Sequence, residues 1–170
     1  MKLLHDWGFS AESWQGQRGE YWVITQALLV IGFTLLPIYR PPGWSSPSPP
    51  EIYAIWGVAG CLGLVSSVFF LKGLLDLGNS LTPLPYPRED GELVESGVYA
   101  LVRHPVYSGV IFGTVAIAVW FLSLSHGLGA IVCFLFFNAK ASREEIWLRQ
   151  KYPNYGNYQA RVKKLVPWLY

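Results

Sequence analysis

The run Arg103-His104-Pro105-Val106-Tyr107 places a guanidinium, an imidazole and a phenol at the start of an apolar stretch. Proline suits the first turn of a helix, where backbone N–H groups have no partner within the helix. Those free N–H groups could bind an anion, and the two basic side chains could add to such a site. Tyr99 and Tyr107 contribute aromatic faces and hydroxyls. The alternative for this pattern is the basic, aromatic boundary that membrane helices commonly have.

A second pair of ionisable residues interrupts the last apolar stretch. Lys140 and Glu144 are four residues apart, so they lie on one face of a helix, and Trp147 and Lys151 extend the same face. A carboxylate in this position can accept hydrogen bonds from ribose hydroxyls or balance a cation. The alternative is an exposed helical ion pair at the membrane edge, which stabilises by about 0.3–0.5 kcal/mol.

The composition indicates an integral membrane protein with a single domain over residues 1–170. The chain is 52% hydrophobic and only 14% charged, whereas soluble domains carry roughly 25% charged residues. The net charge of +2 is too small to indicate nucleic-acid binding. Cys61 and Cys133 lie in separate apolar runs, which favours two reduced thiols over a disulfide or a metal site.

Four transmembrane helices are predicted, over about 21–39, 52–71, 106–124 and 127–150, in an all-α fold. The first three stretches contain no charged residue and have close to the roughly 20 residues that cross a bilayer core. The proline-rich segment from Arg40 to Pro50 joins the first two and is predicted to be non-helical.

The fourth stretch is too short to cross the bilayer on its apolar residues alone. Between the predicted turn at 123–127 and Lys140 it covers about 20 Å. The helix is therefore expected to continue to about Lys151, ending before Pro153, so that 106–151 forms a helical hairpin. Lys140 would then lie inside the boundary of the membrane. An ionisable group in such a position usually faces protein or a water-filled cavity. The alternative is snorkelling with local thinning of the bilayer.

The distribution of Lys and Arg predicts the orientation in the membrane. Seven basic residues lie from Lys140 onward, three lie between 72 and 103, and Lys2 and Arg18 precede the first span, whereas the turn after the third span has none. Because basic loops stay in the cytosol, both termini and the 76–104 loop are expected there. This brings the Arg103 and Lys140 regions to the same side of the membrane.

In their order along the chain, these residues resemble the integral-membrane methyltransferases that include isoprenylcysteine carboxyl methyltransferase and the phospholipid N-methyltransferases. The similarity covers roughly residues 77–170, the expected catalytic region, and no single element of it is specific. The matching elements are Leu77-Gly78-Asn79, Leu81-Thr82-Pro83, Leu93-Val94, Ser96-Gly97-Val98-Tyr99, Arg103 to Gly109, Glu144-Glu145 and Lys151 to Tyr158.

The resemblance implies that S-adenosylmethionine binds in a cytosolic site formed by this loop, the helices and the tail, and that S-adenosylhomocysteine is the product. A lipophilic acceptor would reach the methyl group from the bilayer. Lys140, where the family has a basic residue implicated with the substrate, is the expected substrate-binding residue, and Lys140, Arg103 and His104 are the catalytic candidates. The implied cofactor-binding residues are Glu92, Leu93, Val94, Tyr99, His104, Pro105, Val106, Tyr107 and Glu144.

Methyl transfer from a sulfonium needs positioning and exclusion of water more than a strong base. The leading expectation for the acceptor is an isoprenylcysteine-type carboxylate, which needs no deprotonation. A phosphatidylethanolamine-type amine would need a base, for which His104 is the candidate. Alternatives of another class are a non-catalytic lipid-binding or assembly protein and a sterol-reductase-like oxidoreductase. The small size is similar to that of prokaryotic members, which predicts an inner or plasma membrane location.

Overall fold

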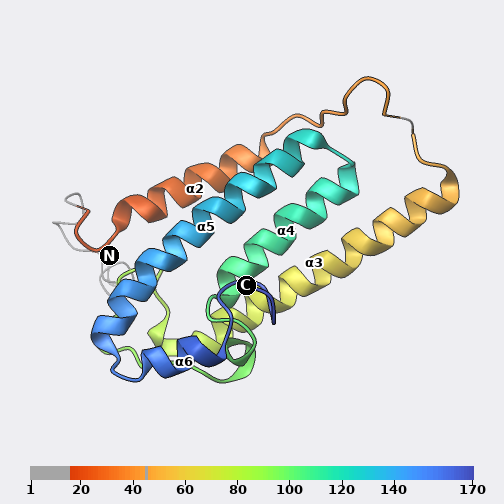
Figure 1. The fold of residues 1–170 in the computed structure, drawn as a ribbon. Helices are drawn as coiled ribbons and strands as arrows, with labels where there is room; N and C mark the ends of the chain where they lie inside the picture. The colour runs from red at the N-terminus through yellow and green to blue at the C-terminus, as the bar shows by residue number, and fades with distance from the viewer. Residues whose placement is uncertain (1–15, 45) are drawn as a thin grey trace.

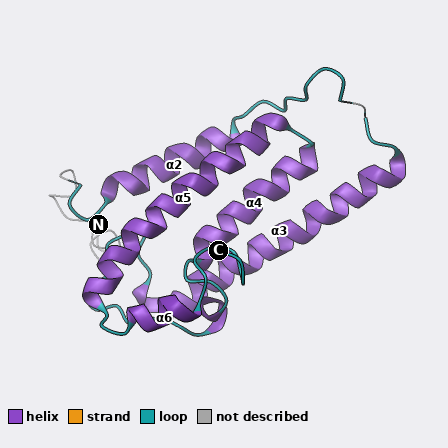
Figure 2. Ribbon diagram, viewed as in Figure 1, coloured by secondary structure: helices purple, strands orange, loops and turns teal. Residues whose placement is uncertain are grey.

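The computed structural model describes residues 16–44 and 46–170, and within them the regular structure is helical, with one isolated β-bridge between Val102 and Lys163 (Figure 2). The four long helices lie side by side in the order α2, α5, α4, α3 (Figure 1). Lys2, used in the orientation prediction, lies outside the described residues. The elements are α2 (Glu20–Thr34), α3 (Pro49–Leu77), η2 (Gly78–Ser80), η3 (Gly97–Ala100), α4 (Pro105–Phe121), α5 (Leu124–Lys151) and α6 (Tyr155–Arg161).

Two helical segments, Pro49–Ser80 and Leu124–Lys151, are long and apolar enough to cross a membrane, and α2 and α4 are shorter apolar helices. The outer faces of α2 and α3 carry large apolar side chains, and Leu28, Leu64 and Leu75 are each at least 66% exposed. Continuous exposed apolar surface of this kind marks a membrane or protein contact. The all-helical fold is confirmed for the described residues, and the count of four spans stays a prediction.

The first predicted span was too long, because α2 ends at Thr34 rather than near residue 39. Pro37 explains the early end: a proline within the helix would lack an N–H donor, and it also disfavours helical geometry in the residue before it. The non-helical residues after α2 cross the α4–α5 turn, where the carbonyl of Tyr39 accepts a hydrogen bond from the Leu124 N–H at 2.8 Å.

The second predicted span was too short, since α3 extends beyond 52–71 at both ends. The prediction that the segment to Pro50 is non-helical was wrong at its last two residues. Pro49 and Pro50 occupy the first turn of α3, where their missing N–H groups are not needed. Ser48 and Glu51 form a capping box, with the Glu51 carboxylate accepting the Ser48 N–H at 2.8 Å.

The hairpin of α4 and α5 has a tighter connection than predicted. α4 ends at Phe121, Leu122 adopts a left-handed conformation with φ of 48°, and α5 already begins at Leu124. The hydroxyl of Ser123 caps α5 by accepting the N–H of His126, so only two residues form the turn instead of 123–127. At its other end α5 stops at Lys151, as the sequence predicted.

α3 packs closely against α4. A Cβ atom added to Gly109 would lie 2.7 Å from the backbone nitrogen of Phe70, and one added to Gly73 would lie 3.1 Å from that of Val106. The hydroxyl of Ser66 donates to the Gly109 carbonyl at 2.7 Å. Small residues therefore let the backbones of the two helices approach closely.

The chain after α6 fixes the start of α4. The N–H groups of Arg103 and His104 donate to the carbonyls of Lys163 and Lys164, at 2.8 and 3.1 Å. The hydroxyl of Ser108 donates to the carbonyl of Leu165 at 2.6 Å. These two backbone N–H groups are therefore engaged within the protein and are not available to an anion. The tail therefore holds the Arg103–Pro105 turn in place.

Candidate active site

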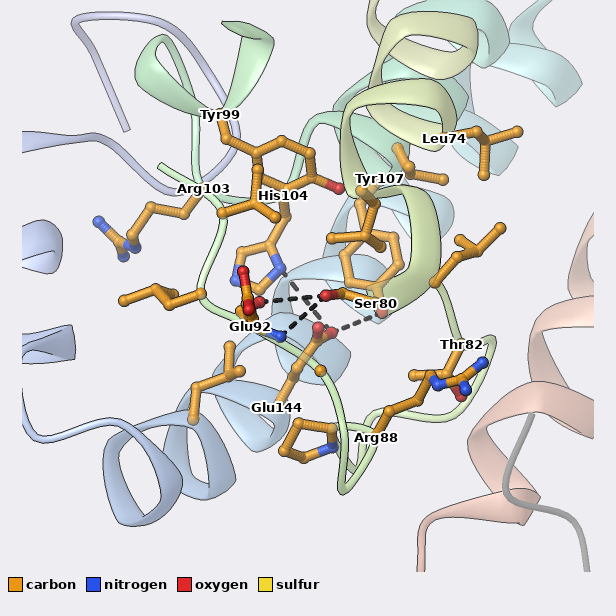
Figure 3. A pocket seen from close by; sticks show the side chains of 18 of the residues that line it. Leu74, Ser80, Thr82, Arg88, Glu92, Tyr99, Arg103, His104, Tyr107 and Glu144 are labelled. Atoms are coloured by element: carbon orange, nitrogen blue, oxygen red, sulfur yellow. Dashed lines mark hydrogen bonds and ion pairs between the residues drawn. The ribbon is translucent and has the colours of Figure 1, made fainter. Parts of the chain in front are cut away.

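A cavity of about 310 Å³ lies where α3, α4, α5 and α6 meet the loop that follows α3 (Figure 3). Eight of the nine predicted cofactor-binding residues line it, together with Arg103 and Lys140. The exception is Pro105, which is fully buried beside Gly73 of α3. Residues that sequence reasoning did not assign to the site also line it: Gln26, Phe70, Leu74, Leu77, Ser80, Leu81, Thr82, Pro83, Pro87, Arg88, Gly91, Leu148, Tyr152, Tyr155 and Tyr158.

One wall of the cavity is formed by His104, Tyr107 and Glu144, whose side chains converge in Figure 3. The Tyr107 hydroxyl donates to Glu144 Oε2 at 2.7 Å, and His104 Nδ1 lies 3.8 Å from the same oxygen. The His104 and Tyr107 rings are parallel, with centroids 5.4 Å apart. Because the Glu144 side chain keeps 24% of its surface exposed, it can still accept hydrogen bonds from a ligand.

Arg103 is an anchor for this wall rather than a free cation. Its guanidinium lies 2.7 Å from Glu145 Oε1 in a buried ion pair, and it also donates to backbone carbonyls of Gln159 and Val162. Glu145 also lies 3.2 Å from His104 Nε2. Since adjacent helical residues point about 100° apart, Glu144 can face the cavity while its neighbour binds Arg103. This ion pair ties the start of α4 to α5 and the tail.

The loop after α3 is held over the cavity by hydrogen bonds. The Ser80 hydroxyl accepts the N–H of Glu92 at 3.0 Å and lies 3.2 Å from the Glu92 carbonyl, as Figure 3 shows. From the end of α5, the Tyr152 hydroxyl donates to the Gly91 carbonyl at 2.6 Å and Lys151 donates to the Glu89 carbonyl at 3.1 Å. These bonds place Glu92 and the apolar pair that follows it at the cavity.

Lys140 is 1% exposed and lies at the α2 side of the cavity. Its Nζ donates to Gln26 Oε1 at 2.5 Å and to the Pro83 carbonyl at 3.2 Å, and it lies 5.1 Å from the centroid of the Tyr107 ring. These three partners are neutral. A buried ammonium with neutral partners retains an attraction for an anionic group that enters the cavity.

Tyrosines of η3 and α6 close the side of the cavity next to the tail. The Tyr158 hydroxyl donates to the Tyr99 carbonyl at 2.7 Å, and the Tyr99 hydroxyl donates to the Gly73 carbonyl at 3.2 Å. Burial raises the pKa of Tyr99, Tyr155 and Tyr158, so these phenols stay neutral and keep their protons at physiological pH. Of these three tyrosines, only Tyr99 was assigned to the site from the sequence.

The residues present suit a nucleoside with a positive centre. Carboxylates at Glu92 and Glu144 can accept from ribose hydroxyls or an amine, the rings of Tyr99 and Tyr107 offer π faces, and Leu93 belongs to an apolar patch. The buried hydroxyl of Tyr155 has no hydrogen-bond partner among residues 16–44 and 46–170, as expected where a ligand supplies one. Within the part of the chain that the structure describes, no cluster of His, Cys, Asp and Glu could hold a metal ion.

Comparison with known proteins gives one family. The model of the family described as phospholipid methyltransferase matches residues 55–155. Protein-S-isoprenylcysteine O-methyltransferase B of Arabidopsis thaliana is 33% identical over 110 residues, which are 62% of this chain and 56% of that protein. A probable protein-S-isoprenylcysteine O-methyltransferase of Oryza sativa subsp. japonica is 30% identical over 128 residues, covering 71% of this chain and 66% of that protein. The chain thus spans less than two thirds of these relatives.

Proposed function

Because the chain belongs to the phospholipid methyltransferase family, we propose that it methylates the carboxylate of an isoprenylcysteine-type acceptor, with S-adenosylmethionine as the methyl donor. The observation that carries this proposal is the composition of one cavity. Hydrogen-bonding groups at Glu92, His104 and Glu144 share it with a buried cation at Lys140 and with apolar side chains of α3. Such a cavity has places for a polar cofactor, a carboxylate and a lipid chain.

The cofactor would occupy the side bounded by the loop, α4 and Glu144. When bound, S-adenosylmethionine supplies a methyl group already activated by a sulfonium. Glu92 and Glu144 accept hydrogen bonds, Tyr99 and Tyr107 present π faces to the positive centre, and Leu93 and Val94 with Val106 cover the apolar portion. In this proposal Pro105 acts by setting the first turn of α4, and Arg103 positions His104 through their shared partner Glu145.

Lys140 supports a carboxylate acceptor over an amine. Its ammonium contacts neutral groups, and the Glu144 carboxylate one turn along α5 already accepts the Tyr107 hydroxyl, so an incoming carboxylate is attracted and a protonated ethanolamine head group is repelled. The carboxylate oxygen bonds to the methyl carbon as the carbon–sulfur bond breaks, which leaves a neutral ester and a thioether and moves no proton. His104, already between Glu144 and Glu145, is then not required as a base.

The lipid chain of the acceptor would enter along α3. Phe70, Leu74 and Leu77 line the cavity from one face of that helix, and Phe70 is 38% exposed. Outside the cavity the same helix carries exposed apolar side chains, which suits contact with acyl chains. In this proposal all four apolar helices cross the bilayer, residues 1–170 form one domain, and the cavity and both termini are cytosolic.

A methyl-transfer assay tests this function. Purified protein in phospholipid vesicles is given S-adenosylmethionine with a tritiated methyl group and either N-acetyl-S-farnesylcysteine or its carboxamide. We expect label on the carboxylate compound alone, released as methanol by mild base, because methyl esters hydrolyse readily. Base-stable label on added phosphatidylethanolamine would instead identify an amine acceptor. No transfer to either acceptor, with no binding of S-adenosylhomocysteine, would exclude a methyltransferase.

Lys140→Met is expected to lower kcat/KM for the farnesylcysteine acceptor by about 10- to 150-fold, the range for loss of a hydrogen bond to a charged group. S-adenosylhomocysteine affinity, measured by calorimetry, should change by less than about twofold. The control is Lys164→Met, because Lys164 binds Asn138 and Ser142 outside the cavity. An equal loss of cofactor affinity in Lys140→Met would mean that Lys140 only holds Gln26 and Pro83 together.

A further inference from the structure

The cavity is lined by five tyrosines, and four of their hydroxyls have protein acceptors. Tyr107 donates to Glu144, Tyr99 to the Gly73 carbonyl, Tyr152 to the Gly91 carbonyl and Tyr158 to the Tyr99 carbonyl, all at 2.6–3.2 Å. These four hydroxyls stabilise the cavity walls. They are engaged before any ligand arrives.

The fifth tyrosine, Tyr155, differs from the others. Only 1% of the residue is exposed, and its hydroxyl has no hydrogen-bond partner within the part of the chain that the structure describes. Among the described residues, no other fully buried side-chain nitrogen or oxygen lacks a partner. Leaving a buried hydroxyl unpaired costs stability, so a native structure that does so needs a reason.

The surroundings of Tyr155 indicate what could satisfy it. The ring packs edge-to-face on Tyr158, at a centroid distance of 5.8 Å, which fixes it on the first turn of α6. The Tyr158 hydroxyl in turn donates to the carbonyl of Tyr99, one of the residues assigned to the cofactor, at 2.7 Å. Lys140 lies elsewhere, against Gln26 and Pro83 at the α2 side. Tyr155 therefore belongs to the cofactor side of the cavity and not to the acceptor side.

We infer that the Tyr155 hydroxyl donates a hydrogen bond to an acceptor atom of the bound nucleoside cofactor, making α6 a ligand-binding element. This inference rests on the proposed function. Burial keeps the phenol protonated, so it can donate to a carboxylate, a ribose oxygen or a ring nitrogen. The hydroxyl contributes binding and no chemistry, because methyl transfer to a carboxylate needs no proton.

Tyr155→Phe tests the inference by removing the hydroxyl and keeping the ring. By calorimetry, S-adenosylhomocysteine should bind about three- to tenfold more weakly, which matches the loss of one hydrogen bond. The melting temperature without ligand should stay equal or rise, since an unsatisfied buried hydroxyl is removed. The KM for S-adenosylmethionine should rise in proportion, while the KM for farnesylcysteine stays unchanged.

Tyr170→Phe is the control, because this tyrosine does not line the cavity and its hydroxyl donates to Asn138 Oδ1 at 3.1 Å. This variant should bind S-adenosylhomocysteine within about twofold of wild type. Unchanged affinity in Tyr155→Phe would overturn the inference and leave the proposed function standing, with water as the partner of the hydroxyl. If the wild type bound no S-adenosylhomocysteine, the proposed function would fail and the inference with it.

Discussion

Glu144→Ala is expected to lower the affinity for S-adenosylhomocysteine by about 10- to 150-fold, the range for losing a hydrogen bond to a charged group. The carboxylate is the accessible anionic group of the His104–Tyr107 wall, so no neighbouring side chain can replace it. Calorimetry with protein in detergent micelles measures this loss. At the upper end of this range, we expect binding of S-adenosylhomocysteine by Glu144→Ala to fall below the detection limit of calorimetry.

Two further variants separate the charge of Glu144 from its structural contact. Glu144→Gln keeps an acceptor for the Tyr107 hydroxyl, so its affinity loss reports the charge alone. Glu89→Ala removes an exposed carboxylate that does not line the cavity, and it should bind the cofactor normally. If Glu144→Ala also bound normally, the carboxylate would serve only as the partner of Tyr107.

Glu145→Ala is expected to destabilise the folded protein by about 3–5 kcal/mol, because it leaves the buried guanidinium of Arg103 without its counter-charge. The pair is almost completely buried, with side-chain exposures of 7% and 4%, and Glu145 also accepts from Gln159 at 2.8 Å. The midpoint of unfolding in mixed micelles measures the effect. Cofactor affinity should fall too, since His104 loses a contact.

A double-mutant cycle separates the ion pair from general damage to the core. The double variant Arg103→Met/Glu145→Ala removes both charges and should recover much of the stability lost in its two single variants, Arg103→Met and Glu145→Ala. The exposed ion pair between Arg161 and Glu95 is the control, and Glu95→Ala should cost no more than about 1 kcal/mol. Additive losses in the buried cycle would contradict coupling between the two charges.

The sequence predicted the ends of a helix well where the length of its apolar stretch sets them, and less well where a proline sets them. The run of α5 through Lys140 to Lys151 followed from the short apolar stretch and from Pro153 beyond it. Proline acted in opposite ways elsewhere: Pro37 ends α2, whereas Pro49 begins α3. The difference depends on whether a helix precedes the proline or follows it, which hydrophobicity alone does not reveal.

For the candidate site, the sequence identified residues in or near the Arg103–Tyr107 run and the Lys140/Glu144 pair. It missed residues that only tertiary packing brings to the cavity. Glu144 and Glu145 are adjacent in sequence, and only the helical phase relative to Arg103 determines which one faces the cavity. Gln26 comes from α2, more than a hundred residues before its partner Lys140. Tyr155 looked like one more aromatic residue in a basic tail. None of these contacts leaves a local pattern in the chain.

The backbone bonds from Arg103 and His104 to Lys163 and Lys164 also have a consequence for biosynthesis. They join positions sixty residues apart, so they can form only after α5 and α6 have been synthesised. Until then the turn at His104 lacks its fixed geometry, and the cavity lacks its α6 side. The cavity is therefore completed only late in synthesis, once the last forty residues of the chain have joined it.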